Sequence, residues 1–187
     1  MKKIIAFVIC FAMAFMFAGC KAEELRPEEY ISEAALTQCR IRVMANQRFY
    51  NDVFVLGHLK VDESKKFEKD GKTYAPVADG LYQNYQELKD DLSQTYTSEC
   101  VDRILKTYNY YADVDGKLCF DMSCSDKAEK GIKYVLGDKH EPELEDINGD
   151  VYEIEFYFVC GKKDELHTFE FVKQDSAYLL NELTRVR

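Results

Sequence analysis

The alternation of apolar and polar side chains from Val151 to Cys160 constrains the fold of this chain more than any other feature. From Tyr152 onward every second residue is apolar, and the positions between them include Glu153 and Glu155. Period-two alternation is typical of a strand with one buried face and one face in water. The apolar face carries these side chains: Tyr152, Ile154, Phe156, Phe158 and Cys160. Such a sheet needs other elements to cover its apolar face.

The flanking segments predict that this strand belongs to a meander of about four antiparallel strands. The Asn-Gly pair at residues 148–149 is a strong hairpin signal, and the segment from Gly161 to Asp164 is a short polar turn. The other strands of the meander are expected over residues 132–136, 167–171 and 178–186.

The segments that can cover this sheet come earlier in the chain. Pro-Glu-Glu at residues 27–29 favours the start of a helix, which we expect to run to about Tyr50. Apolar residues at helical spacing predict a second helix over residues 85–96, and Thr97 is suited to cap a third. The predicted fold class is therefore α+β, with an N-terminal helix and a helix pair packed on a curved antiparallel sheet that ends in a C-terminal strand meander.

Shorter strands are expected between these helices. Alternation predicts a strand over residues 53–61 and a short return strand over residues 72–77. The Asp-Gly pair at residues 115–116 predicts a hairpin between strands at residues 109–114 and 117–122.

Residues 1–19 resemble the signal peptide of a bacterial lipoprotein. Two lysines precede an apolar run over residues 4–17 that is too short for a comfortable membrane span. The run leads into Phe-Ala-Gly-Cys at residues 17–20, which is similar to the lipobox, where leucine usually holds the first position.

The lipobox resemblance implies cleavage before Cys20 and lipid attachment at Cys20, followed by a lipidated tether over residues 20–26 and a single α+β domain over residues 27–187. The acyl chains would hold the protein at the outer face of the bacterial cytoplasmic membrane. An ordinary secretory signal with an incidental cysteine is the alternative.

The charge of the chain bears on its partners. The formal net charge of −9 becomes −11 when Lys2 and Lys3 leave with the signal peptide, because two positive charges are removed. Nucleic acid is excluded as a partner, since its phosphates need a basic face. A basic protein suits this chain, because opposite charge speeds encounter. Acidity that serves solubility alone is the alternative.

The cysteine count leaves the redox state open. Five cysteines follow Cys20, and an odd count in an exported chain leaves at least one thiol unpaired. Cys119 and Cys124 are close enough in sequence for a local disulfide if the geometry permits it. The five cysteines are Cys39, Cys100, Cys119, Cys124 and Cys160.

Catalytic signatures are missing from the sequence, and we expect no enzyme activity, cofactor or metal site. A glycine-rich phosphate loop and a Gly-x-Ser-x-Gly elbow are both absent from it. Nothing places a cysteine beside His58, His140 or His167, as a cysteine–histidine nucleophile requires. Cys119 and Cys124 alone do not make a zinc site, because a second pair or a nearby histidine is lacking.

The segment from Asp138 to Asp150 is rich in carboxylates and is the candidate binding surface. One interpretation is an acidic prong that docks into the basic cleft of a partner. The other is a solvated loop or strand pair whose charges protect the sheet edge from unwanted pairing. The candidate partner-binding residues are Asp138, Glu141, Glu143, Glu145 and Asp146.

A longer pattern runs through the predicted helix pair and the hairpin that follows. Its residues are Tyr85-Gln86-Glu87-Leu88, Leu92 and Thr95-Tyr96-Thr97, then Val101 and Ile104, then Asp115-Gly116-Lys117-Leu118. This spacing resembles the IseA family, exported inhibitors of bacterial cell-wall DL-endopeptidases, over residues 30–187. The lipobox and the extra cysteines depart from the secreted, cysteine-poor form of that family.

The resemblance implies that the protein fills the substrate groove of an NlpC-type cysteine peptidase, a basic cell-wall hydrolase. The alternative is a cystatin-like or nuclear-transport-factor-like lipoprotein that binds a small apolar ligand in a sheet cavity. The lining of that cavity would be Tyr134, Tyr152, Phe156 and Phe171.

Overall fold

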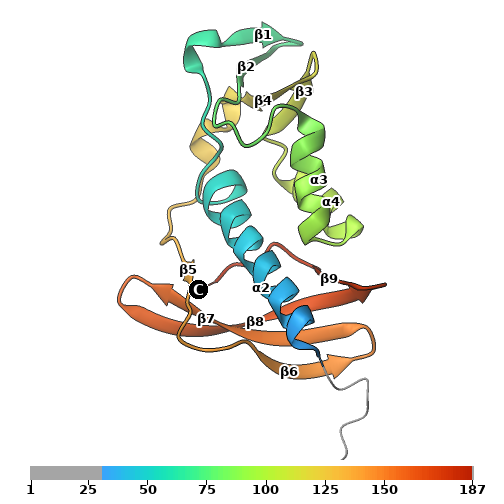
Figure 1. Ribbon diagram of the computed structural model, residues 1–187. Helices are drawn as coiled ribbons and strands as arrows, with labels where there is room; N and C mark the ends of the chain where they lie inside the picture. The colour runs from blue at the N-terminus through green and yellow to red at the C-terminus, as the bar shows by residue number, and fades with distance from the viewer. Residues whose placement is uncertain (1–30, 187) are drawn as a thin grey trace, which may run out of the picture. The chain divides into compact units, whose positions relative to one another are not determined.

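The structure is a computed structural model that describes residues 31–186 (Figure 1). Contacts divide the chain into residues 1–31 and residues 32–187, and every element described below belongs to the second unit. The expected signal peptide, the lipid attachment at Cys20 and the helix start at residues 27–29 lie outside the described residues. None of the helices in the described range has the length and apolar character that a membrane span requires.

Helix α2 (Glu33–Arg48) begins immediately after Ser32. The side-chain oxygen of Ser32 accepts a hydrogen bond from the N–H of Ala35 at 3.2 Å, which satisfies one free donor of the first turn. The helix buries one stripe against the rest of the unit, made by Ala35, Cys39, Val43 and Asn46.

The chain passes from α2 directly into a π-helix over Phe49–Phe54. The strand predicted over residues 53–61 is therefore wrong. The apolar residues of the π-helix recur at helical spacing and are buried, so they continue the core face of α2 rather than start a sheet. Val61 alone pairs within the predicted range, in an isolated bridge with Val77.

The first sheet has the strand order β1-β2-β4-β3, with all neighbours antiparallel. Its β3–β4 hairpin turns at Asp115 and Gly116 as predicted, and both have positive φ. Strand β1 was not predicted, although Asp70 and Gly71 form the same kind of turn after it. A 3-10 helix (Glu63–Lys65) precedes β1, and another (Met122–Lys127) follows β4. The strands are β1 (Phe67–Lys69), β2 (Lys72–Pro76), β3 (Tyr111–Val114) and β4 (Lys117–Asp121).

Asp121, at the end of β4, is a buried carboxylate with charged and polar partners. Its side chain accepts hydrogen bonds from the Lys72 ammonium at 2.7 Å and the Ser123 hydroxyl at 2.7 Å. Burial alone raises the pKa of Asp121, but these hydrogen bonds outweigh burial and bring the pKa below its ordinary value of 3.8. Asp121 therefore stays ionised where β2 and β4 meet.

The predicted helix pair is confirmed as α3 (Tyr85–Thr95) and α4 (Ser98–Thr107). Thr97 caps α4 as expected, because its side chain accepts a hydrogen bond from the N–H of Cys100. The corner between the helices is fixed to the C-terminal sheet, since the N–H of Thr97 donates to the carbonyl of Leu180 at 3.0 Å.

The second sheet contains the C-terminal meander. Strand β7 is confirmed over the predicted residues and pairs with β8 along its whole length, while β6 and β5 pair with different parts of its other edge. The strands are antiparallel and strongly curled, which confirms the predicted α+β fold class, although they divide between two sheets. The strands are β5 (Val135–Leu136), β6 (Glu143–Asn148), β7 (Val151–Cys160), β8 (Lys163–Gln174) and β9 (Ala177–Leu180).

The first strand of this sheet, β5, is shorter than predicted, and side chains of α2 and of the π-helix bind backbone groups at this strand and at the residue before it. The carboxamide of Gln47 donates to the carbonyl of Tyr134 and accepts from the N–H of Leu136. Asn51 donates to the same Tyr134 carbonyl. These contacts cap a strand edge that would otherwise be free to pair.

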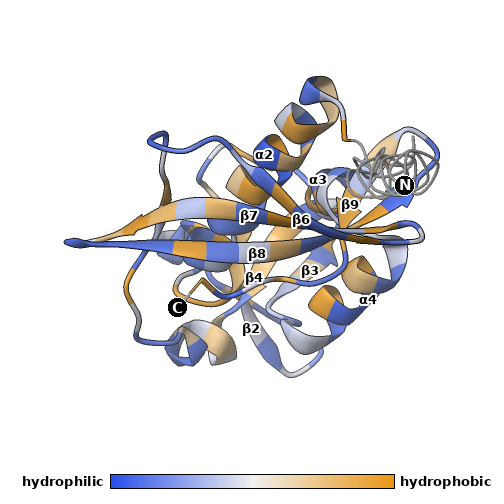
Figure 2. Cartoon of the chain, turned by 90° about the horizontal axis from the view of Figure 1, so that it is seen from below, coloured by the Kyte–Doolittle hydropathy of each residue, from blue (hydrophilic) through white to orange (hydrophobic). Residues whose placement is uncertain are grey.

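The core lies between the inner face of the second sheet and α2, which contacts both β9 and β5. Figure 1 shows α2 crossing this sheet, and Figure 2 allows the hydropathy alternation to be followed along β7 and β8. Asn46 is the polar centre of this core and is only 1% exposed. Its side-chain oxygen accepts from the Tyr96 hydroxyl and the Thr184 N–H, and its amide donates to the Thr184 carbonyl. One side chain of α2 thereby holds both the helix corner and the C-terminal segment.

Candidate functional site

The candidate site is the outer face of the second sheet, opposite the core. Residues directly opposite one another in an antiparallel pair lie on the same face. Glu143 of β6 lies opposite Glu155 of β7, and Asp146 lies opposite Glu153. Glu153 also lies opposite Glu170 of β8. We call these five carboxylates the acidic face.

The acidic face places like charges opposite one another, and their repulsion lowers the stability of the sheet. Like charges directly opposite on neighbouring strands are destabilising. None of the ion pairs within residues 31–186 includes a member of the acidic face. The acidic face thus offers uncompensated negative charge to the solvent.

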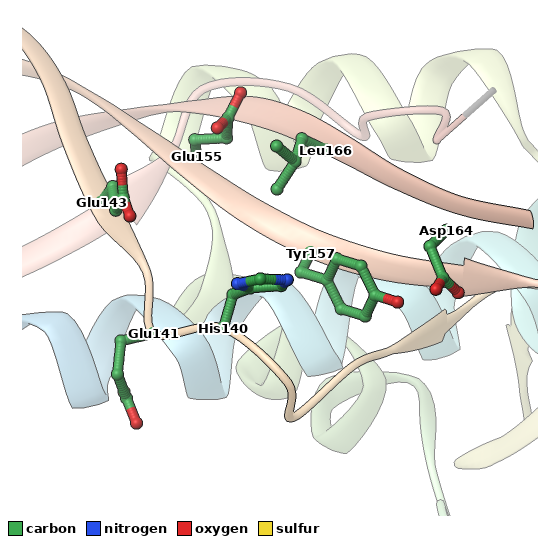
Figure 3. A pocket seen from close by; sticks show the side chains of 7 residues that line it. All are labelled: His140, Glu141, Glu143, Glu155, Tyr157, Asp164 and Leu166. Carbon is green, nitrogen blue, oxygen red and sulfur yellow. The ribbon is translucent and has the colours of Figure 1, made fainter.

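A hollow of about 220 Å³ adjoins the acidic face (Figure 3). Two members of the acidic face, Glu143 and Glu155, contribute to its lining. The loop between β5 and β6 forms another part of its wall. The full lining is His140, Glu141, Glu143, Glu155, Tyr157, Asp164 and Leu166.

Lys139, beside this hollow, forms an ion pair with Asp164. The Lys139 ammonium lies 2.9 Å from the Asp164 carboxylate. The hydrogen bond to Asp164 raises the pKa of Lys139, so this lysine stays charged and neutralises Asp164. The carboxylates of Glu141, Glu143 and Glu155 have no such partner among the described residues.

Tyr157 is the buried member of the lining. It belongs to the wet face of β7 by sequence pattern, yet it is only 6% exposed because the preceding loop crosses its ring. Gly137 makes this crossing possible, since a Cβ there would lie 2.1 Å from the ring. The Tyr157 hydroxyl is buried beside the Asp164 carboxylate and the Lys139 ammonium, and its interaction with Asp164 lowers the pKa of that carboxyl. Figure 3 shows it directed toward the Asp164 side of the hollow.

Of the five predicted partner-binding residues, two belong to the acidic face, one lines only the hollow, and two belong to neither. Glu143 and Asp146 belong to the acidic face, and Glu141 joins Glu143 in the lining of the hollow. Glu145 falls at the irregularity in the β6–β7 register, and Asp138 is exposed in the loop. Three members of the acidic face were not among the predicted partner-binding residues, although they form the polar half of the alternation in β7 and β8. They are Glu153, Glu155 and Glu170.

The four aromatic residues proposed to line a ligand cavity lie in the core. Tyr134, Tyr152, Phe156 and Phe171 are between 0% and 8% exposed. The Phe156 ring packs against Phe169 and Phe171 at centroid distances of 5.7 and 6.1 Å. Only Tyr134 borders a described cavity, one of about 10 Å³, which is at the lower limit for a single water molecule. This packing gives the ligand-binding alternative no support.

Among the described residues, the cysteines form no disulfide and the potential metal ligands form no metal site. All five cysteines of the described part are free thiols, so the local disulfide between Cys119 and Cys124 is not formed in this structure. Burial raises the pKa of the Cys39 thiol to about 12. Within residues 31–186, no three side chains of His, Cys, Asp or Glu are grouped to hold a metal ion.

Comparison with known proteins adds no identification. No family model matches the chain, and no curated protein matches it in sequence. The resemblance to the IseA family therefore stays a prediction from the spacing of residues 85–118.

Proposed function

We propose that the protein is a lipid-anchored inhibitor of a basic peptidoglycan hydrolase at the outer face of the cytoplasmic membrane. It has no catalysis of its own and blocks the substrate groove of an NlpC-type DL-endopeptidase. The observation that carries this proposal is the acidic face, where carboxylates oppose one another on β6, β7 and β8. The lipid anchor at Cys20 is part of the same proposal.

Electrostatics support this choice of partner. Repulsion between opposed carboxylates is relieved when a basic surface covers them, so part of the binding free energy comes from strain already present in the sheet. A sheet face is also more rigid than a loop, which lowers the entropy lost on docking. The long β7–β8 hairpin gives the acidic face that rigidity, because its strands pair over ten consecutive positions.

The test is inhibition of peptidoglycan cleavage by a purified NlpC-type DL-endopeptidase at low salt. The variant Asp146→Asn/Glu153→Gln removes one opposed pair from the acidic face. We expect it to inhibit about tenfold less strongly, since each exposed charge contributes at most about 1 kcal/mol. The matched control Glu68→Gln/Asp102→Asn removes two exposed charges elsewhere and keeps full inhibition. Equal loss in both variants would reject docking through the acidic face.

A further inference from the structure

We propose that two copies of this chain pair through the open edge of strand β8, with the two strands antiparallel and a two-fold axis at Leu166. Main-chain hydrogen bonds would supply the contact, as they do when a strand is added to a sheet. The proposal does not depend on the inhibition proposed above, because it concerns the edge of the sheet and not its acidic face.

The edge is open because β8 is longer than its neighbour β9. Strand β7 pairs with residues 163–172 of β8, whereas β9 pairs with the other edge over residues 171–174 alone. Among residues 31–186, no strand pairs with that other edge before Phe171. The unpaired backbone groups of an edge strand are a template for pairing with another chain.

The backbone groups at the open edge belong to even-numbered residues. The N–H of Lys173 donates to the carbonyl of Asp150, on the β7 side, at 2.7 Å. Hydrogen-bonding groups of an antiparallel strand alternate between its two edges from one residue to the next. Asp164, Leu166 and Thr168 therefore direct their N–H and C=O groups away from β7. Even-numbered residues must pair with even-numbered ones in a β8–β8 dimer, so only every second register is possible.

Charge on β8 selects one of these registers. A two-fold axis at Asp164 or Glu165 would set a carboxylate opposite its own copy. An axis at His167 would set Asp164 opposite Glu170. Like charges at directly opposite positions are destabilising, so these registers are disfavoured. Axes beyond His167 would bring the second strand onto positions that β9 already occupies. An axis at Leu166 avoids all of these conflicts.

The register centred on Leu166 also forms favourable pairs. Leu166 is 55% exposed in the single chain and would meet its own copy at the axis. Glu165 would lie opposite His167, and this contact would occur twice because the axis repeats it. Apolar pairs and pairs of carboxylate with a hydrogen-bond donor stabilise neighbouring strands.

An ion pair at each end of the contact would fix the register. Lys162, in the turn before β8, would lie opposite Glu170 of the second copy. The Glu170 carboxylate accepts from the Asn181 amide at 3.1 Å, which holds it beside the end of β9. Opposite charges across neighbouring strands are favourable, and other registers lose this pair.

The pairing would join the second sheets of two copies into one continuous sheet. Side chains at directly opposite positions lie on the same face, and Glu170 belongs to the acidic face in each copy. The two acidic faces would therefore lie on the same side of the joined sheet. A dimer of this kind presents two equivalent binding surfaces, which raises avidity for a partner with repeated sites.

Oxidative cross-linking of the purified full chain tests the register directly. Leu166→Cys places the two introduced thiols opposite each other, with Cα atoms about 5.5 Å apart, which a disulfide can span. The matched control Thr168→Cys separates its thiols by roughly 13 Å along the strands. We expect a covalent dimer from Leu166→Cys alone, with wild type reporting any cross-linking through native thiols. Equal cross-linking of both variants, or none in either, would overturn the proposal.

A charge exchange tests the same register without a covalent bond. Sedimentation velocity from about 1 µM to about 1 mM covers the affinities expected of a small interface. Lys162→Glu and Glu170→Lys each create two like-charge pairs in the dimer and should each weaken self-association about tenfold. Lys162→Glu/Glu170→Lys exchanges the charges and should return the affinity to within about twofold of wild type. Weakening without this rescue, or a wild-type monomer at every concentration, would contradict pairing through β8.

Discussion

Asn46→Ala should destabilise the fold by about 2–3 kcal/mol. The asparagine side chain makes three hydrogen bonds in the core, at 3.0, 3.0 and 3.1 Å, to Tyr96 and to both backbone groups of Thr184. Each contributes about 1 kcal/mol net, so their loss costs about 3 kcal/mol. The higher helix propensity of alanine returns about 0.5 kcal/mol. The Tyr96 hydroxyl, in a residue only 1% exposed, has no access to water as a substitute partner.

The assay for Asn46→Ala is urea unfolding followed by circular dichroism, with the loss read from the midpoint at constant slope. Tyr96→Phe removes one of the three hydrogen bonds and should cost about 1 kcal/mol. A double-mutant cycle between the two should give a coupling of about 1 kcal/mol, because the residues are in contact. Thr37→Ala, an exposed change on the same helix, is the control and should stay within about 0.5 kcal/mol. A loss below about 1 kcal/mol for Asn46→Ala would refute the role of this residue as the polar centre of the core.

Three further predictions concern other parts of the unit. Gly137→Ala should destabilise by about 1–3 kcal/mol and shift the Tyr157 ring resonances, because the added Cβ would lie 2.1 Å from that ring; unchanged resonances would contradict the crossing described above. Because the pKa of Asp121 is lowered in the folded state, the carboxylate stabilises the fold above its ordinary pKa of 3.8, and this stability is lost as pH falls through the folded-state pKa. Asp121→Asn should therefore reduce the fall of the urea midpoint between about pH 6 and about pH 2. The exposed control Glu68→Gln should leave that fall unchanged. Native-state alkylation should label half-buried Cys160 before the four buried thiols of the described residues, and simultaneous labelling would contradict their burial.

The elements that could be predicted are those in which one periodicity runs without interruption. Strand β7 alternates from Val151 to Phe156, and α3 and α4 have capping residues as well as helical spacing. The strand predicted over residues 53–61 failed because its first apolar residues also fit the helical face that precedes it. Strand β1 was missed because its flanks are charged, although the Asp-Gly turn after it is a clear signal.

The site was predictable in composition but not in shape. The excess of carboxylates after Asp138 and the wet face of β7 were both visible in sequence. Register determines which of these charges oppose one another, and residues far apart in sequence, such as Glu153 and Glu170, meet only in the folded sheet. The burial of Tyr157 was not predictable at all, since local alternation assigns it to the wet side and only a crossing loop covers it.

The most direct test of the central claim is a titration of an NlpC-type DL-endopeptidase with the purified full chain over a salt series, followed through peptidoglycan cleavage. The account predicts stoichiometric inhibition at low salt that weakens steadily as salt rises, because screening acts on exposed charges of the acidic face. The absence of inhibition with several such enzymes, or inhibition that does not change with salt, would contradict docking through the acidic face.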